Sequence, residues 1–101
     1  MNSRLELHEV LCSVLGNRNT YFQPPENIKM KYPAIVYKRD DIINSQANNE
    51  VYKQAKKYQL IVIDQNPDSE IVQKISKLSR IRYDRHYVSD GLNHDVFTIF
   101  Y

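Results

Sequence analysis

The chain has 101 residues, 42% of them apolar, and carries 14 Lys and Arg against 12 Asp and Glu, a formal net charge of +2. Such a length suits one domain with one hydrophobic core, over residues 1–101. The near-balanced charge gives no case for bulk attraction to nucleic acid or to a membrane surface. No apolar run approaches the ~20 residues of a membrane span, and no signal-peptide stretch is recognised. A single cysteine, Cys12, excludes an intrachain disulfide framework and a cysteine-based zinc site, so we expect a soluble protein of a reducing compartment.

Two helices are predicted. Ser3 and Glu6 form a capping box, an apolar stripe follows at three- and four-residue spacing, and Gly16 supplies the stop, which gives a helix over 3–15. A turn with a capping serine opens a second apolar stripe, which gives a helix over 69–79.

Four strands are predicted from β-branched and aromatic runs at 34–39, 51–64, 81–88 and 96–101. Asp90-Gly91 between the last two is a strong hairpin signal. The order of elements favours an α+β fold, a mainly antiparallel sheet of about four strands with two helices packed on one face. The residues expected in the core are Leu7, Leu11, Val14, Ile35, Leu60, Val62, Ile71, Ile75 and Leu78.

The connecting stretches carry further information. Residues 17–32 include Pro24-Pro25 and read as a loop that Tyr21 and Phe22 pin to the core. Residues 40–50 are polar and read as a hairpin tip or a mobile loop. At ~3.3 Å per residue, the strand that follows would span roughly 45 Å, more than a sheet of this size needs. The sequence therefore predicts a long protruding hairpin.

Metal and acid–base residues gather in one place, around the last hairpin. If the strand alternates regularly, Asp84 and His86 share one face, with Asp95 across from them, and Asp90 and His94 lie nearby. Tyr83, Arg85 and Tyr87 would then share the other face. No second pair at fixed spacing supports a metal site. We expect His86 and His94 to be separated or held by protein groups, without a metal or a cofactor.

The sequence contains no other pattern that is typical of a catalytic site. Cys12 is expected as a small buried residue, and His8 as a histidine of the helix surface. No serine lies in a Gly-x-Ser-x-Gly elbow, and the two glycines leave no phosphate-cradling loop. We therefore expect a protein that is not an enzyme, with a metal-dependent enzyme as the last alternative.

Basic and aromatic residues interleave in the polar half of the long strand. Such residues could bind single-stranded nucleic acid. Alternatively, the lysines could protect an exposed strand from edge-to-edge aggregation. The low net charge favours the second reading, and a small nucleic-acid-binding regulator stays an alternative. The residues concerned are Tyr52, Lys53, Lys56, Lys57 and Tyr58.

Several segments, together with the terminal aromatic strand, resemble small tail-completion proteins of tailed bacteriophages. The segments are 21–25, 30–37, 63–69, 83–88 and 90–95. In element order and size the chain also resembles the tail terminator proteins of long-tailed phages. This resemblance implies an α+β virion protein that assembles as a hexameric ring on the last ring of the tail tube. There it would end tail polymerisation and offer the surface to which the head joins.

The resemblance further implies a tail or neck location, assembly in the host bacterial cytoplasm, and no membrane. The partners would be further copies of the chain, the major tail tube protein and a head-completion or neck protein. Genomic DNA would pass through the lumen without specific binding. A neck protein between portal and tail, either a stopper or an adaptor, is the nearest alternative.

The protruding hairpin, residues 39–57, is the expected interface with a neighbouring subunit or the tube; we call it the arm. It is too polar to bury against its own domain, so in the isolated chain we expect its tip to be mobile. Two tyrosines are expected as aromatic anchors and charged residues as polar partners. The predicted interface residues are Arg39, Asp40, Asp41, Tyr52, Lys53, Lys56, Lys57 and Tyr58.

Overall fold

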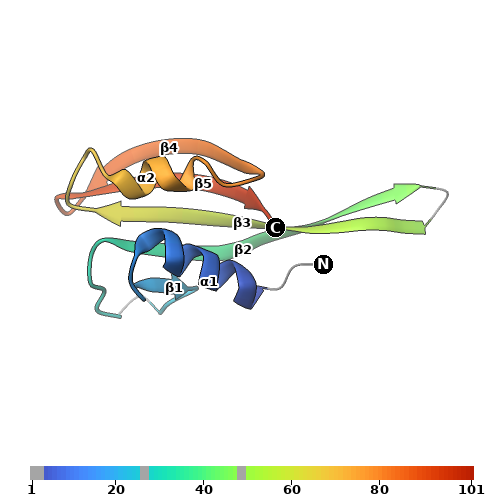
Figure 1. Cartoon of the computed structure of the whole chain (residues 1–101), viewed down its shortest axis with the longest axis horizontal. Coiled ribbons are helices and arrows are strands. Elements are labelled where there is room, and N and C mark those ends of the chain that lie inside the picture. Colours follow the sequence, from blue (N-terminus) through green and yellow to red (C-terminus); the bar gives the residue numbers. More distant parts are fainter. Residues whose placement is uncertain (1–3, 26–27, 48–49) are drawn as a thin grey trace.

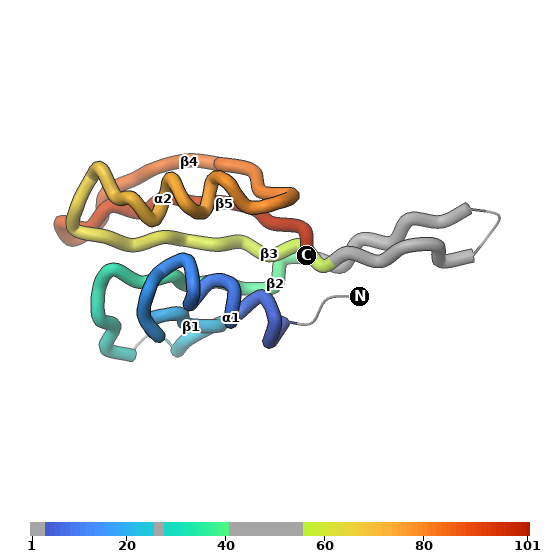
Figure 2. The backbone as a smooth tube through the Cα atoms, in the orientation of Figure 1, coloured from blue at the N-terminus to red at the C-terminus, as the bar shows by residue number. Residues whose placement is uncertain are grey.

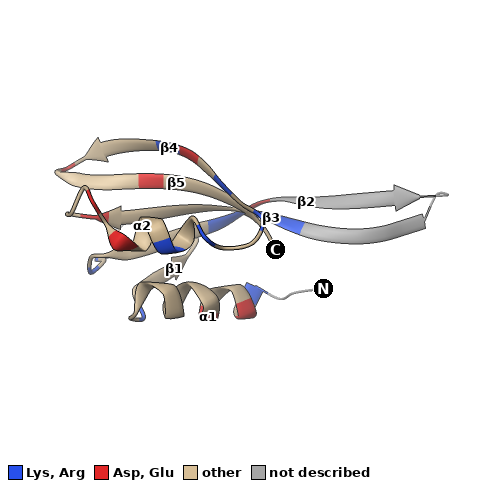
Figure 3. Ribbon diagram, turned by 45° about the horizontal axis from the view of Figure 1, so that its top comes forward, with Lys and Arg blue, Asp and Glu red and all other residues tan. Residues whose placement is uncertain are grey.

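The structure, a computed structural model, describes residues 4–25, 28–47 and 50–101, and side chains within 4–25, 28–40 and 56–101. Both helices lie on the same side of one sheet (Figures 1 and 3). In chain order the elements are α1 (Arg4–Leu15), β1 (Thr20–Phe22), β2 (Ala34–Ala47), β3 (Glu50–Asp64), α2 (Glu70–Ile75), β4 (Ile81–Ser89) and β5 (Leu92–Phe100).

The sheet has five strands in the order β1-β2-β3-β5-β4. All neighbours are antiparallel except β1 and β2, which are parallel. The predicted α+β architecture is confirmed, and the strand count of four is corrected to five. The added strand, β1, lies in the stretch predicted as a loop, where Gln23 N donates to Tyr37 O at 2.9 Å. Three residues are too short to show a strand period, and their partner strand is distant in sequence.

The core lies between the helices and the face of the sheet that they cover. Of the nine predicted core residues, seven are buried, while Val14 and Leu78 are half-buried and pack against the cluster. Tyr37, Tyr58 and Phe97 are the largest side chains in it, each at most 1% exposed. Apolar burial of this kind is the main favourable contribution to folding.

The second helix is shorter than predicted. It starts after Ser69, whose hydroxyl caps Ile71 N, but it ends at Ile75, where Ser76 forms the C-cap. The Ser76 hydroxyl donates to Val72 O at 2.7 Å, and such bonding to the preceding turn competes with helix continuation. The remaining residues to 79 form turns, which still place Leu78 against the core.

Two strands run further than predicted. β2 continues to Ala47 and so includes much of the polar stretch read as a loop. β5 begins at Leu92, because the hairpin turn consists only of Asp90 and Gly91, with φ of 53° and 73°. Positive φ at both positions is the two-residue turn that Asp-Gly predicts.

Candidate functional site

The arm is defined by which strands pair with which. β5 pairs with β3 over 57–64, and β1 pairs with β2 over 35–37. In the described register, the far parts of β2 and β3 pair with each other alone, from Ile42↔Lys56 to Ala47↔Glu50. The molecule measures 51 Å along this direction against 25 and 23 Å across it (Figure 1). This confirms the predicted protruding hairpin.

The base of the arm is fixed to the domain. Lys57 Nζ lies 3.4 Å from Asp40 Oδ2, which ties the two strands together where they leave the sheet. Tyr101 N donates to Lys56 O at 2.8 Å, so the last described residue lies against the arm's base (Figure 2). Tyr58 contacts the Tyr37 ring edge-on at 6.0 Å between centroids. The base of the arm is therefore held to the domain by an ion pair, a backbone hydrogen bond and a ring contact.

Tyr58 needs a correction among the predicted interface residues. Its side chain is only 1% exposed and faces the helices, opposite Ile99 in the register, so it belongs to its own core and cannot anchor a partner. Burial also raises the pKa of Tyr58 above its ordinary value. The lysines on either side of Tyr58 led to the prediction that this part of β3 is polar on both faces. The register shows instead that the Tyr58 side chain lies on the face that packs against the helices.

The other predicted interface residues fall into two groups. Arg39 is exposed and Lys56 half-buried, and Asp40 and Lys57 hold each other. The side chains of 41–55 lie outside the described residues, and with them the predicted contacts of Asp41, Tyr52 and Lys53 and the predicted mobility of the tip.

The histidines of the last hairpin have separate protein partners, as predicted. His86 Nε2 lies 3.1 Å from Asn93 Oδ1. His94 Nδ1 lies 3.1 Å from Leu92 O, and its ring stacks on Tyr87 at 4.6 Å between centroids. Across residues 4–25, 28–47 and 50–101, no group of three or more His, Cys, Asp or Glu is arranged to hold a metal ion.

A β-bulge changes which residues share a face. The register between β4 and β5 shifts between Tyr83 and Arg85. Asp84 therefore contacts Thr98 on one face, whereas His86 pairs with Asp95 on the other. The prediction that Asp84 and His86 share a face is wrong because the bulge inserts one residue.

Two carboxylates on the strands of this hairpin, Asp84 and Asp95, have hydrogen-bond partners. Asp84 Oδ2 accepts from Thr98 Oγ1 at 2.6 Å, and Asp84 Oδ1 accepts from Arg82 Nε at 2.9 Å. Burial opposes the charge of Asp84, but these hydrogen bonds outweigh it and lower the pKa of its carboxyl. Tyr83 donates to Asp95 Oδ1 at 2.9 Å. These carboxylates thus have structural partners.

Among the described residues, no helix lies over the face of the sheet opposite α1 and α2, which we call the open face (Figures 1 and 3). Four of its side chains are nevertheless buried, namely Ala34, Ile63, Val96 and Thr98. Its residues form rows across β2, β3, β5 and β4, read from the register. The rows are Lys38–Gln59–Thr98–Arg82, Val36–Ile61–Val96–Arg85 and Ala34–Ile63–His94–Tyr87.

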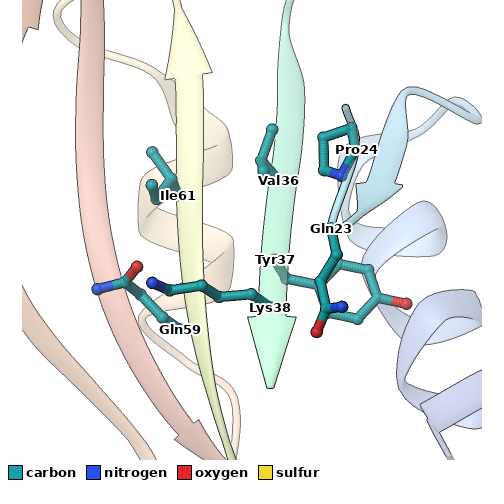
Figure 4. A pocket seen from close by; sticks show the side chains of 7 residues that line it. All are labelled: Gln23, Pro24, Val36, Tyr37, Lys38, Gln59 and Ile61. Atoms are coloured by element: carbon teal, nitrogen blue, oxygen red, sulfur yellow. The ribbon is translucent and has the colours of Figure 1, made fainter. Parts of the chain in front are cut away.

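At one side of the open face the surface is hollowed. A pocket of about 290 Å³ is lined by the residues labelled in Figure 4. Val36 and Ile61 lie beside each other, Pro24 stands next to Val36, and the helices lie behind the strands. Lys38 reaches across β3 toward Gln59. The pocket is therefore apolar at its floor and polar at its rim.

Comparison with known proteins finds no family model that matches the chain and no curated sequence that matches it. Within the described residues, no helix is long and apolar enough to cross a membrane.

Proposed function

We propose that this chain is a structural virion protein that caps the tail tube of a long-tailed phage as a ring. It would end tail polymerisation and present the surface to which the head joins. The observation that carries the proposal is the arm, whose strands pair only with each other beyond the sheet in the described register and whose root is fixed by Lys57, Asp40 and Tyr58. The resemblance to tail terminators supports the same assignment.

Assembly into a ring places physical demands on the surface of each subunit. A ring needs a heterologous interface, in which one surface of each subunit docks on a different surface of the next. A hairpin that leaves its own sheet has strand edges available for backbone pairing with another chain. The contacts at the base of the arm restrict its direction, which lowers the ordering cost of docking. We infer that six copies form the ring on the last ring of tube subunits, with a neck protein as the partner on the head side.

The nearest alternative is a neck protein one layer up. A ring of twelve would favour an adaptor, whereas six copies allow a stopper or a terminator. The addition of the purified chain to polymerising tube protein separates these layers, because only a terminator limits the length of the tube.

A deletion in the arm tests the proposed interface most directly. In the polymerisation assay, deletion of 43–50 is expected to abolish the limit on tube length, whereas replacement of the same eight residues by a Gly/Ser stretch of equal length tests whether reach alone suffices. Hydrogen exchange should show greater protection of the arm in the assembled particle than in the isolated chain. Equal protection in both states, with assembly intact after the deletion, would assign the arm to the chain's own fold and overturn the proposed interface.

A further inference from the structure

The open face carries an excess of positive charge. Its rows contain three cations, Lys38, Arg82 and Arg85, all exposed, and no carboxylate among these described positions. One carboxylate, Asp84, lies on the same face at the bulge, where it accepts from both Arg82 and Thr98 and offsets the charge of Arg82. In Figure 3 the basic segments of β4 flank the acidic one. The face therefore has net positive charge, although the whole chain is close to neutral.

An aromatic stack stands at one end of the same face. The rings of Tyr87 and His94 stack at 4.6 Å with an angle of 13° between their planes. The guanidinium carbon of Arg85 lies 5.8 Å from the centre of the Tyr87 ring. Tyr87 is 37% exposed, so the stack is reachable from solvent. A flat ring beside a cation is the arrangement that binds a nucleobase and its phosphate.

The pocket stands at the other end. Its floor is formed by Pro24, Val36 and Ile61, and the amide side chains of Gln23 and Gln59 lie at its rim. Carboxamides donate and accept hydrogen bonds, as the edges of bases do. Lys38 lines the same pocket and can neutralise a phosphate beside it. At ~4.8 Å per strand, β2 and β4 lie about 14 Å apart.

We propose that the open face binds single-stranded nucleic acid. One base occupies the pocket, another stacks on Tyr87, and Lys38 and Arg85 contact the phosphates. An open sheet backed by helices, with rings and cations on its surface, can stack two or three bases of a single strand. Charge complementarity selects this occupant, because a second copy docked through the same face would bring its own cations against these ones. The inference goes beyond the proposed ring and does not depend on it.

Binding should be weak and sensitive to salt. Each phosphate contact to a single strand contributes a slope of about −0.7 to log K against log salt, so the two contacts of Lys38 and Arg85 give about −1.4. The test is fluorescence anisotropy of the full chain with a short labelled oligothymidylate and an oligoadenylate RNA at about 50 mM salt and above. A duplex of the same length serves as the competing probe.

The variants are matched for charge. Lys38→Gln with Arg85→Gln is expected to weaken binding at least tenfold and to flatten the salt slope. Lys29→Gln with Lys31→Gln removes the same charge from exposed loop positions and should change affinity less than twofold. Tyr87→Ala should cost about fivefold or more, as loss of a stacked base does, whereas Val88→Ala, an exposed neighbour on the other face, should leave affinity unchanged. Thermal unfolding verifies that each variant is folded.

Four results would overturn the proposal: no saturable binding at low salt, equal loss in the two double variants, equal affinity for the duplex, or self-association that Tyr87→Ala abolishes. The last would assign the open face to a second copy of the chain.

Discussion

At the scale of single residues, Tyr37 connects the first helix to the sheet. Its hydroxyl accepts from Arg4 at 3.3 Å and lies 2.8 Å from His8 Nδ1, while its ring packs at 4.9 Å from Phe22. Because Arg4 already donates to this oxygen, the hydroxyl hydrogen can be donated to the neutral imidazole. Burial raises the pKa of Tyr37, so the group stays a phenol.

Tyr37→Phe should therefore destabilise the protein by about 1 kcal/mol, because the ring packing is kept and the hydrogen bonds are lost. The measurement is urea unfolding. Tyr21→Phe is the control, since its hydroxyl accepts a long 3.4 Å bond from Lys31 N, and it should cost less than about 0.5 kcal/mol. Equal losses in the two variants would contradict the linking role of Tyr37.

His8 makes stability depend on pH. Burial, followed by the charges of Arg18 and Arg4, lowers the pKa of His8 below its ordinary value of 6.5. The unfolded chain then binds the proton more readily than the folded chain. Neutral His8 therefore contributes fully to the free energy of unfolding above pH 6.5, and this contribution is lost as the pH falls below that value. We expect a lower urea midpoint at pH 5 than at pH 7.5. His8→Gln should reduce this difference, and an unchanged difference would exclude His8 as its source.

At the scale of elements, the first helix illustrates how far a local pattern predicts structure. Its apolar stripe correctly placed Leu7 and Leu11 in the core. The start of the helix was predicted at Ser3, which lies outside the described residues. Capping and spacing act within a few residues, so the sequence carries them directly.

That stripe yields a direct stability prediction. Leu11→Ala should cost about 2–5 kcal/mol, because Leu11 is fully buried and its loss leaves a cavity. Leu5→Ala on the same helix should cost less than about 0.5 kcal/mol, since Leu5 is 65% exposed. Unfolding of both variants in urea measures the difference. Similar costs would mean that the helix packs on the sheet through another face.

What the sequence missed depends on pairing between distant strands. β1 is a strand only because Thr20 lies opposite Ile35, and three residues have no period of their own. Tyr58 reads as part of a polar run until the register places it opposite Ile99. The open face likewise joins Lys38 to Arg82 across two intervening strands, and the bulge at Asp84 decides which β4 side chains reach it.

At the scale of the whole molecule, the helices cover one face of the sheet, and the two proposals concern two other surfaces. The arm extends the molecule along its 51 Å axis, and the open face presents cations and rings away from the helices. The two proposals concern different surfaces, so a result that contradicts one proposal does not contradict the other. A variant of the open face should still cap tubes, and a variant that lacks residues 43–50 should still bind the single strand.

The most direct test of the tail-terminator assignment is an electron cryomicroscopy reconstruction of tails assembled with this chain. We predict one ring of six copies at the head-proximal end of the tube, with each arm in contact with a neighbouring subunit or with the tube. A chain found elsewhere on the particle, or a tube end without a ring of it, would contradict the account.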